Sequence, residues 1–334
     1  MIKILFIGSF LIHHGSKDVC ETISEKISQD NFKCKLVSRK QNKILRLLDI
    51  LTSVLFFSGK IIHINVFSGP AFQISEYASL LAKLRGKKLL LSLHGGILPE
   101  FSERNASRIA KVFNRADKIL TPSLYLKAFF EKQGYQIDYL PNSVDLAKFP
   151  YGRNQVKPSS ILWVRAFTQI YNPELAIKAF LEVKKKIPEA TLTMVGPDKG
   201  ILNESKELIH KLGLEDSITI TGPVKNEELY TYFQSHSVFI NTTSYESFGV
   251  AVLEAASCGI PIVSTKVGEI PYLWEHEKNI LLTLDFEPVN FANEILKLIN
   301  NQDMSSNLSR EARIKAESFT WENIKPYWIK VLKD

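Results

Sequence analysis

Two glutamates, Glu246 and Glu254, are separated by seven residues, and Gly249 lies between them where an apolar helix should begin. That helix is predicted to run to Cys258 and to stop at Gly259, because glycine commonly follows the last residue of a helix. A helix N-terminus presents unpaired N–H groups and attracts phosphate, and a glycine there allows a close approach to the backbone. A carboxylate in the second turn can accept hydrogen bonds from the vicinal hydroxyls of a ribose. The spacing predicts a sugar-nucleotide site; the alternative is a surface loop followed by a core helix with one solvated glutamate.

The segment from Asn241 to Trp274 resembles the E-x7-E signature of family 4 of the retaining GT-B glycosyltransferases. Other landmarks of that family follow the same order, so the resemblance covers nearly the whole chain. They are His94 to Gly96, Ala116 to Ser123, Pro141 to Asp145, Leu192 to Gly196 and Ile218 to Gly222. The resemblance implies the GT-B fold, an α/β architecture of two doubly wound Rossmann-like domains that face a cleft.

Breaking the bond between a sugar and a nucleoside diphosphate leaves new negative charge on the pyrophosphate, which a catalyst must stabilise. The resemblance implies that the helix starting at 248–250 does this together with an Arg and a Lys after the first strand of the second domain. The sequence departs from that pattern, because Ala166 and Tyr171 stand where Arg and Lys are common. We expect Arg165 to supply the positive charge and Tyr171 to donate at most a hydrogen bond. Lys199 is a second candidate, and a solvated Arg165 in a degenerate site is the alternative.

The resemblance also implies that His94, at the end of a strand of the first domain, contacts the transferred sugar. The catalytic candidates are therefore His94, Arg165 and Glu246. The donor-binding candidates are Gly15, Arg165, Gly222, Val224, Phe248, Gly249, Val250 and Glu254. No metal ligand is expected, since the family acts without a metal, and no cofactor beyond the nucleotide-sugar donor. Retention of configuration by front-side substitution or by a covalent intermediate stays open.

The composition indicates a globular protein of 334 residues with 45% hydrophobic content, enough for two cores. Three scattered cysteines without CxxC spacing favour a reducing cytoplasm. The apolar N-terminus is predicted to be a buried first strand rather than a signal peptide, and no apolar run reaches the length of a membrane span. The absence of GxGxxG argues against a nicotinamide enzyme, and no binding motif for nucleic acid occurs.

Apolar strands and amphipathic stretches alternate along both halves, as expected for parallel sheets covered on both faces. The loop-like Pro141 to Arg153 is the predicted linker. The expected domains are residues 1–150, on the acceptor side, and residues 151–319, which bind the nucleotide sugar. Residues 320–334 are expected to pack back on the first domain.

Charge is unevenly distributed between the halves. Residues 1–150 hold 22 Lys and Arg against 12 Asp and Glu, a net of +10, which leaves −3 of the total +7 for the remainder. Residues 39–57 begin with clustered cations and continue strongly apolar, a pattern typical of helices that lie on anionic membranes. One hypothesis is therefore a peripheral protein at the inner face of the cell membrane. The alternative is a helix whose apolar face packs on the sheet and whose cations are solvated.

Three functions are compatible with these features. The first is a retaining, metal-independent hexosyltransferase of polysaccharide biosynthesis, which moves a sugar from a UDP or GDP conjugate to a glycan or lipid-linked acceptor. The second is a nucleotide-sugar epimerase of the same fold, and the third is a degenerate, non-catalytic module that binds sugar nucleotides.

Overall fold

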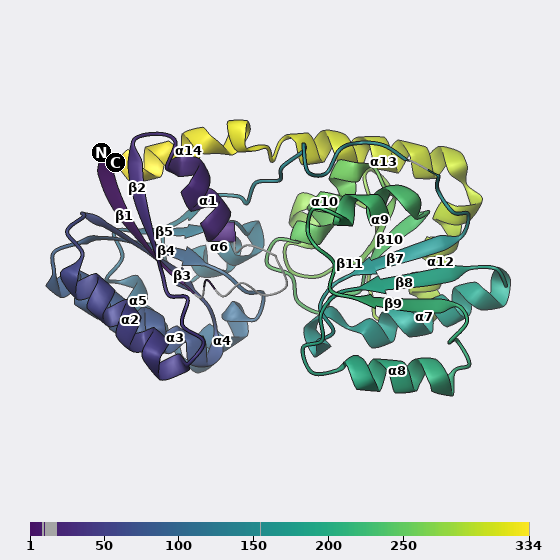
Figure 1. Ribbon diagram of the computed structural model, residues 1–334, viewed down its shortest axis with the longest axis horizontal. Helices are drawn as coiled ribbons and strands as arrows, with labels where there is room; N and C mark the ends of the chain where they lie inside the picture. The colour runs from purple at the N-terminus through teal and green to yellow at the C-terminus, as the bar shows by residue number, and fades with distance from the viewer. Residues whose placement is uncertain (9, 11–18, 154, 334) are drawn as a thin grey trace. The chain divides into compact units, whose positions relative to one another are not determined.

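The computed structural model describes residues 1–8, 10, 19–153 and 155–333. The chain forms two compact units (Figure 1). Unit 1 comprises Met1–Asn142 and Ile324–Asp334, and unit 2 comprises Ser143–Asn323. The domain limits expected from the sequence, at 150 and 319, stay a prediction.

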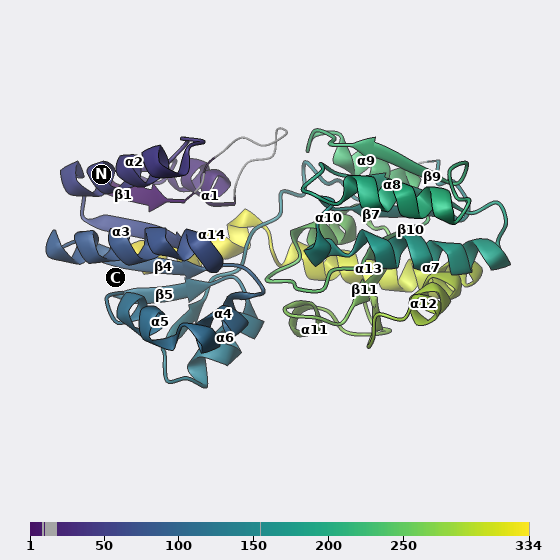
Figure 2. The same cartoon turned by 90° about the horizontal axis from the view of Figure 1, so that it is seen from below.

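Unit 1 is a six-stranded parallel sheet in the order β2-β1-β3-β4-β5-β6. Helices α2, α3 and α5 cover one face, and α1 and α14 lie on the other (Figures 1 and 2). Side chains of β1 point alternately to the two faces of the sheet, so both faces are apolar and are covered by helices. Leu5 and Ile7 join the core under α2 and α3, and Phe6 packs on His63 on the opposite face. The strands are β1 Ile2–Ile7, β2 Phe32–Val37, β3 Ile61–Val66, β4 Lys88–Leu93, β5 Lys118–Thr121 and β6 Ile137–Tyr139.

The helices of unit 1 follow the strands in the expected alternation. They are α1 Val19–Ile27, α2 Lys43–Phe56, the 3₁₀ turn η1 Gly69–Ala71, α3 Phe72–Leu84, α4 Leu98–Arg104, α5 Ala106–Phe113, α6 Leu124–Glu131 and α14 Trp321–Lys333. The final helix is tied to this unit by three contacts. Trp328 packs 5.7 Å from the ring of His63, Lys88 Nζ donates to Val331 O at 3.3 Å, and Lys325 pairs with Asp30 at 2.7 Å. No helix of the described residues is long and apolar enough to cross a membrane.

Unit 2 repeats the plan with the strand order β12-β11-β10-β7-β8-β9. Helices α7, α8 and α12 share one apolar core on one face of the sheet, and α9, α10 and α13 pack together on the other (Figure 1). The strands are β7 Ser160–Val164, β8 Thr191–Val195, β9 Ile218–Gly222, β10 Val238–Asn241, β11 Ile262–Thr265 and β12 Leu281–Thr283. The helices are the 3₁₀ turn η2 Gln169–Tyr171, α7 Pro173–Lys186, α8 Leu202–Lys211, α9 Leu229–Ser235, α10 Val250–Cys258, α11 Ile270–Leu273, α12 Pro288–Asn300 and α13 Gln302–Glu317.

The expected fold class, two doubly wound parallel sheets, is confirmed. In unit 2 the chain starts in the middle of the sheet at β7, proceeds outward through β8 and β9, and returns to the other side at β10. Strand order therefore reverses between β7 and β10. Ligands of open α/β sheets bind outside the carboxyl ends of the strands at such a reversal. This edge of unit 2 is where the predicted donor residues are to be sought.

Candidate functional site

Arg165 follows β7 directly at this reversal, and its guanidinium is fixed by residues from two other elements. Nε and Nη2 donate to Asn241 Oδ1 at 3.1 and 2.9 Å, and Nη2 also donates to Glu246 Oε2 at 2.7 Å. Both charged side chains are about nine-tenths buried, at 9% and 10% exposure. A solvated Arg165, the alternative left open by the sequence, is thus not what the structure shows. Nη1 has no hydrogen-bond partner among the described residues, so one edge of the guanidinium can still donate to a ligand.

Tyr171 lies beneath this guanidinium rather than beside it. The Cζ atom of Arg165 is 5.0 Å from the centre of the Tyr171 ring, a cation–π contact, and burial raises the pKa of the phenol. Thr242 Oγ1 donates to the carbonyl of Tyr171 at 2.8 Å and accepts from Trp163 Nε1 at 3.0 Å. Strand β7, turn η2 and the end of β10 are locked together, so Arg165 has little freedom to move.

The loop that carries Glu246 is held by its own backbone. Glu246 Oε1 accepts from the amides of Ser247 and Phe248 at 3.1 and 3.4 Å, and its carbonyl accepts from Glu269 N at 3.0 Å. Gly268 passes so close that an added Cβ would lie 2.0 Å from Glu246 O. The carboxylate of Glu246 is therefore fixed from both sides, by Arg165 and by the loop amides.

Helix α10 starts at this loop with an unusual cap. Gly249 has φ of +89° and contributes no side chain to cap the helix. The first intrahelical bond runs from Leu253 N to Gly249 O, so the amides of Val250 and Ala251 precede it. Phe248 anchors the entry by an edge-on contact with the buried Phe319 at 5.8 Å. Free N–H groups and the positive end of the helix dipole therefore meet near the guanidinium.

Glu254 lies one turn further along α10 and is half-buried. Burial raises the pKa of its carboxyl to about 7, and the charge of Arg165 opposes this shift. No described residue donates a hydrogen bond to this carboxylate. Its accessible part indicates that a ligand can reach it, and the raised pKa indicates that few polar groups of the protein stabilise its charge.

The neighbouring strand ends form a continuous edge. Arg165 N donates to Val195 O and Gly196 N donates to Gly222 O, both at 3.0 Å, so Gly222 lies two strands from Arg165. Gly222 has φ of +76° with open space at its Cβ position, and Val224 follows in a half-buried loop. The predicted Gly15 lies outside the described residues.

The structure therefore brings Arg165, Glu246, Gly249 and Glu254 together within unit 2. His94 belongs to unit 1, where it follows β4 and its amide donates to Val66 O at 2.9 Å. Its ring stacks on Phe67 at 5.4 Å, and its buried Nε2 has no hydrogen-bond partner among the described residues. Burial lowers the pKa of His94 to about 4, so the ring is neutral at physiological pH.

Asn241 was missed by the sequence reasoning as a functional residue, although it accepts two of the three hydrogen bonds of Arg165. Its amide nitrogen donates to Ser264 Oγ at 2.9 Å, which orients the oxygen toward the guanidinium. A polar residue that ends a buried apolar strand next to the reversal of strand order is the signal that could have found it.

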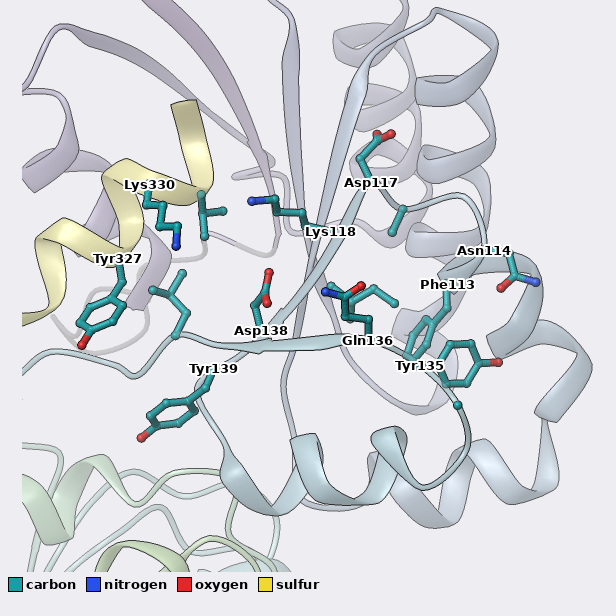
Figure 3. A pocket seen from close by; sticks show the side chains of 15 residues that line it. Phe113, Asn114, Asp117, Lys118, Tyr135, Gln136, Asp138, Tyr139, Tyr327 and Lys330 are labelled. Carbon is teal, nitrogen blue, oxygen red and sulfur yellow. The ribbon is translucent and has the colours of Figure 1, made fainter. Parts of the chain in front are cut away.

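A cavity of about 770 Å³ lies elsewhere, in unit 1 along β5, β6 and α14 (Figure 3). Tyr139 and Tyr327 lie at one end of it and Phe113 and Tyr135 at the other, with Asp138 between them (Figure 3). None of the predicted site residues lines this cavity. No group of three His, Cys, Asp or Glu side chains within the described ranges is arranged to hold a metal ion.

Solved structures share this architecture over the whole chain. Sucrose-phosphate synthase from Thermosynechococcus elongatus superposes with a TM-score of 0.84 at 17% identity, covering 100% of this chain and 98% of that one. HepE from Anabaena, solved in complex with UDP and glucose, gives a TM-score of 0.81 at 16% identity with full coverage of both chains. The fold is therefore that of the GT-B class.

Sequence comparison identifies the family. Residues 148–315, half of the chain, match the family described as Glycosyl transferases group 1. The chain belongs to that family.

Curated relatives match only part of this chain and part of their own length. D-inositol 3-phosphate glycosyltransferase from Paenarthrobacter aurescens is 30% identical over 199 residues, 56% of this chain and 49% of that protein. Mannosylfructose-phosphate synthase from Agrobacterium fabrum is 30% identical over 159 residues, 45% of this chain and 35% of that protein. The chain spans about half the length of the curated relatives that it matches.

Proposed function

We propose that this protein is a retaining, metal-independent glycosyltransferase that moves a hexose from a nucleoside diphosphate sugar to a glycan or lipid-linked acceptor. The observation that carries the proposal is the group of Arg165, Glu246 and Glu254 around the uncapped start of α10. It places a cation, free amides and an unpaired carboxylate at the carboxyl edge of the sheet. These are the groups that a diphosphate and a ribose require.

In the proposed reaction the bond between the anomeric carbon and the diphosphate oxygen breaks, and the electron pair leaves with the phosphate. The free amides at the start of α10 and Arg165 Nη1 stabilise this charge without reorganising, because β7, η2 and the Glu246 loop already hold them. The acceptor hydroxyl adds to the anomeric carbon from the same face, and its proton passes to the departing phosphate oxygen. This front-side route retains the configuration and needs no protein nucleophile.

Two carboxylates have separate roles in this proposal. Glu254 accepts hydrogen bonds from the ribose hydroxyls, and Glu246 orients Arg165 while its loop faces the sugar. The resemblance to family 4 assigns His94 to the transferred hexose, and its neutral ring with a free Nε2 suits a contact with a sugar hydroxyl.

Incubation with radiolabelled UDP-, GDP- and ADP-glucose tests the proposal, with UDP-glucose first because HepE was solved with UDP and glucose. Transfer, or slow hydrolysis of a donor that Arg165→Ala abolishes, supports it. Conversion of the donor sugar into its epimer refutes it in favour of an epimerase. Binding of a donor with neither transfer nor hydrolysis, in the presence of an extract containing candidate acceptors, indicates a non-catalytic module.

We further propose that unit 1 contacts an anionic membrane surface, as a lipid-linked acceptor requires. Helix α2 buries only Ile50 and Val54, and its outer side leaves Ile44, Leu48 and Phe56 exposed by 72%, 53% and 80%. The alternative in which its apolar face simply packs on the sheet therefore accounts for only part of the apolar residues. Cations lie just before the helix at 39 and 40 and in its first turn at 43 and 46, as in helices that lie in the headgroup region.

Co-sedimentation with anionic and neutral vesicles tests this contact. Wild-type protein should bind the anionic vesicles, and the double variant Ile44→Ser, Phe56→Ser should not. Leu284→Ser, which changes an apolar residue of unit 2 that is 83% exposed, is the matched control and should bind normally. Equal, negligible binding of the wild type to both kinds of vesicle would end the idea.

A further inference from the structure

A second cavity, of about 450 Å³, lies within unit 2 at the edge of the sheet opposite to Arg165. It opens beside the amino ends of β7, β10 and β11 and against α12 and α13, because Ser159, Ser237 and Pro261 precede these strands. Its wall combines one arginine, five serines and a glutamine with apolar side chains, and it contains no carboxylate. The cavity is separate from the edge where the proposed donor binds, since none of its lining residues belongs to that edge.

Among the described residues that line this cavity, Arg153 is the only charged one. Its Nη2 donates to Ser237 O at 3.3 Å and its Nη1 to Gly259 O at 3.5 Å, both long for charged donors. No carboxylate pairs with it among the described residues, and burial lowers the pKa of Arg153 to about 10. A partly buried cation with only neutral, distant acceptors is incompletely compensated.

Hydroxyl groups add neutral donors around this cation. Ser159 and Ser305 are buried, and neither side chain has a hydrogen-bond partner among the described residues. Ser306 accepts from Gln302 Nε2 at 3.3 Å and keeps its own proton to donate. Ser305 and Ser306 belong to the first turns of α13, a helix of 16 residues, where the helix dipole also favours negative charge. The guanidinium, these hydroxyls and the start of α13 therefore favour an anion, which competes with the carbonyl oxygens of Ser237 and Gly259 for the guanidinium.

We propose that this cavity binds the phosphate group of a small phosphate monoester through Arg153 and the hydroxyls of Ser159, Ser305 and Ser306. A guanidinium fork can donate two parallel hydrogen bonds to a phosphate, and the surrounding hydroxyls can donate to its remaining oxygens. The volume exceeds that of phosphate alone and falls within the range of small-molecule sites. Leu298, Pro261 and the other apolar side chains of the wall can cover the organic part of the ester.

Calorimetry with inorganic phosphate and with glycerol phosphate at neutral pH tests the site, and it does not depend on the proposed transferase activity. Both probes should bind the wild type, glycerol phosphate more tightly. Arg153→Gln should weaken binding at least about tenfold. Arg310→Gln, which removes an exposed arginine of α13, the helix that carries Ser305 and Ser306, should leave binding unchanged.

Arg165→Gln distinguishes this site from the proposed donor site, and it should keep the phosphate binding described here. Because Arg153 also holds two carbonyls, circular dichroism must show that Arg153→Gln is folded. Ser306→Phe, a change at an exposed position that fills the cavity mouth, provides a second test and should abolish binding. Absence of binding to the wild type at millimolar phosphate, unchanged binding by Ser306→Phe, or loss of binding in Arg165→Gln alone each overturns the proposal.

Discussion

Glu254 should make donor binding depend on pH near neutrality. Burial raises the pKa of this carboxyl to about 7, so its charge changes within the working range of most enzymes. The ionised form accepts hydrogen bonds from two ribose hydroxyls, whereas the protonated form must use one oxygen as a donor. We therefore expect the affinity for UDP-glucose to rise with pH, and Glu254→Gln to remove most of this dependence.

The size of the effect follows from the pKa. With a value of about 7, roughly one carboxyl in eleven is ionised at about pH 6 and roughly ten in eleven at about pH 8. If only the ionised form binds ribose well, the dissociation constant falls about tenfold between these pH values, or about 1.4 kcal/mol. Titration calorimetry with UDP-glucose measures this cleanly, because a diphosphate diester does not change its own charge in this range.

Unfolding experiments provide a second readout with a defined sign. The folded-state pKa of Glu254 lies above its ordinary value of 4.5, so this group stabilises the fold at low pH and loses that contribution as pH rises through about 7. The unfolding free energy of Glu254→Gln, relative to wild type, should therefore increase from about pH 5 to about pH 8. A wild-type affinity that is flat with pH, or a variant that keeps the full dependence, would refute the role assigned to Glu254.

Three further changes have defined outcomes. Arg165→Ala should lower kcat at least about tenfold. It should also destabilise unit 2 by roughly 3 kcal/mol, because it leaves the buried Glu246 unpaired. Turnover assays and chemical denaturation measure the two effects, and wild-type turnover would contradict the assignment. Gly249→Ala should lower the free energy of unfolding by about 1–2 kcal/mol because of its left-handed backbone. It should lose further stability because the added Cβ lies 3.1 Å from a neighbouring side chain. Gly86→Ala, whose Cβ would lie in open space, should show only the loss from the backbone. His94→Ala should reduce turnover and leave the calorimetric affinity for free UDP unchanged, and a matching loss of UDP affinity would remove His94 from the sugar.

Much of the fold could be predicted because its signals are local. Strands β4 and β5 coincide with short, continuous apolar runs in the sequence, the pattern that indicates a buried parallel strand. Some short elements were not predicted from the sequence. One is α4, whose seven residues include Pro99 at its start and show too little periodicity to indicate a helix. The short strand β12 was missed for the same reason.

The sequence predicts which residues form the site, but it does not predict which of them contact one another. Gly249 and Arg165 are placed by the ends of adjacent elements, which the sequence reveals. The ion pair between Arg165 and Glu246 joins positions 81 residues apart, and the cation–π contact with Tyr171 depends on how η2 turns under the guanidinium. Such contacts depend on strand order, which periodicity does not encode. Tyr171, expected to donate at most a hydrogen bond, contacts Arg165 through its ring, and the hydrogen bond from its hydroxyl stays a prediction.

Helix α10 links the two edges of the sheet in unit 2. Its nine residues span about 13 Å, with free amides at one end, while at the other Arg313 donates to Ser257 O at 2.6 Å and Arg153 to Gly259 O at 3.5 Å. An oxyanion bound at Arg153 competes with the carbonyl of Gly259 for the same guanidinium. It therefore changes the hydrogen bonding at the C-terminal end of α10, whose N-terminal end is the proposed diphosphate site. Thermodynamic linkage then requires reciprocity. The factor by which the phosphate ester changes donor affinity must equal the factor by which the donor changes affinity for the ester.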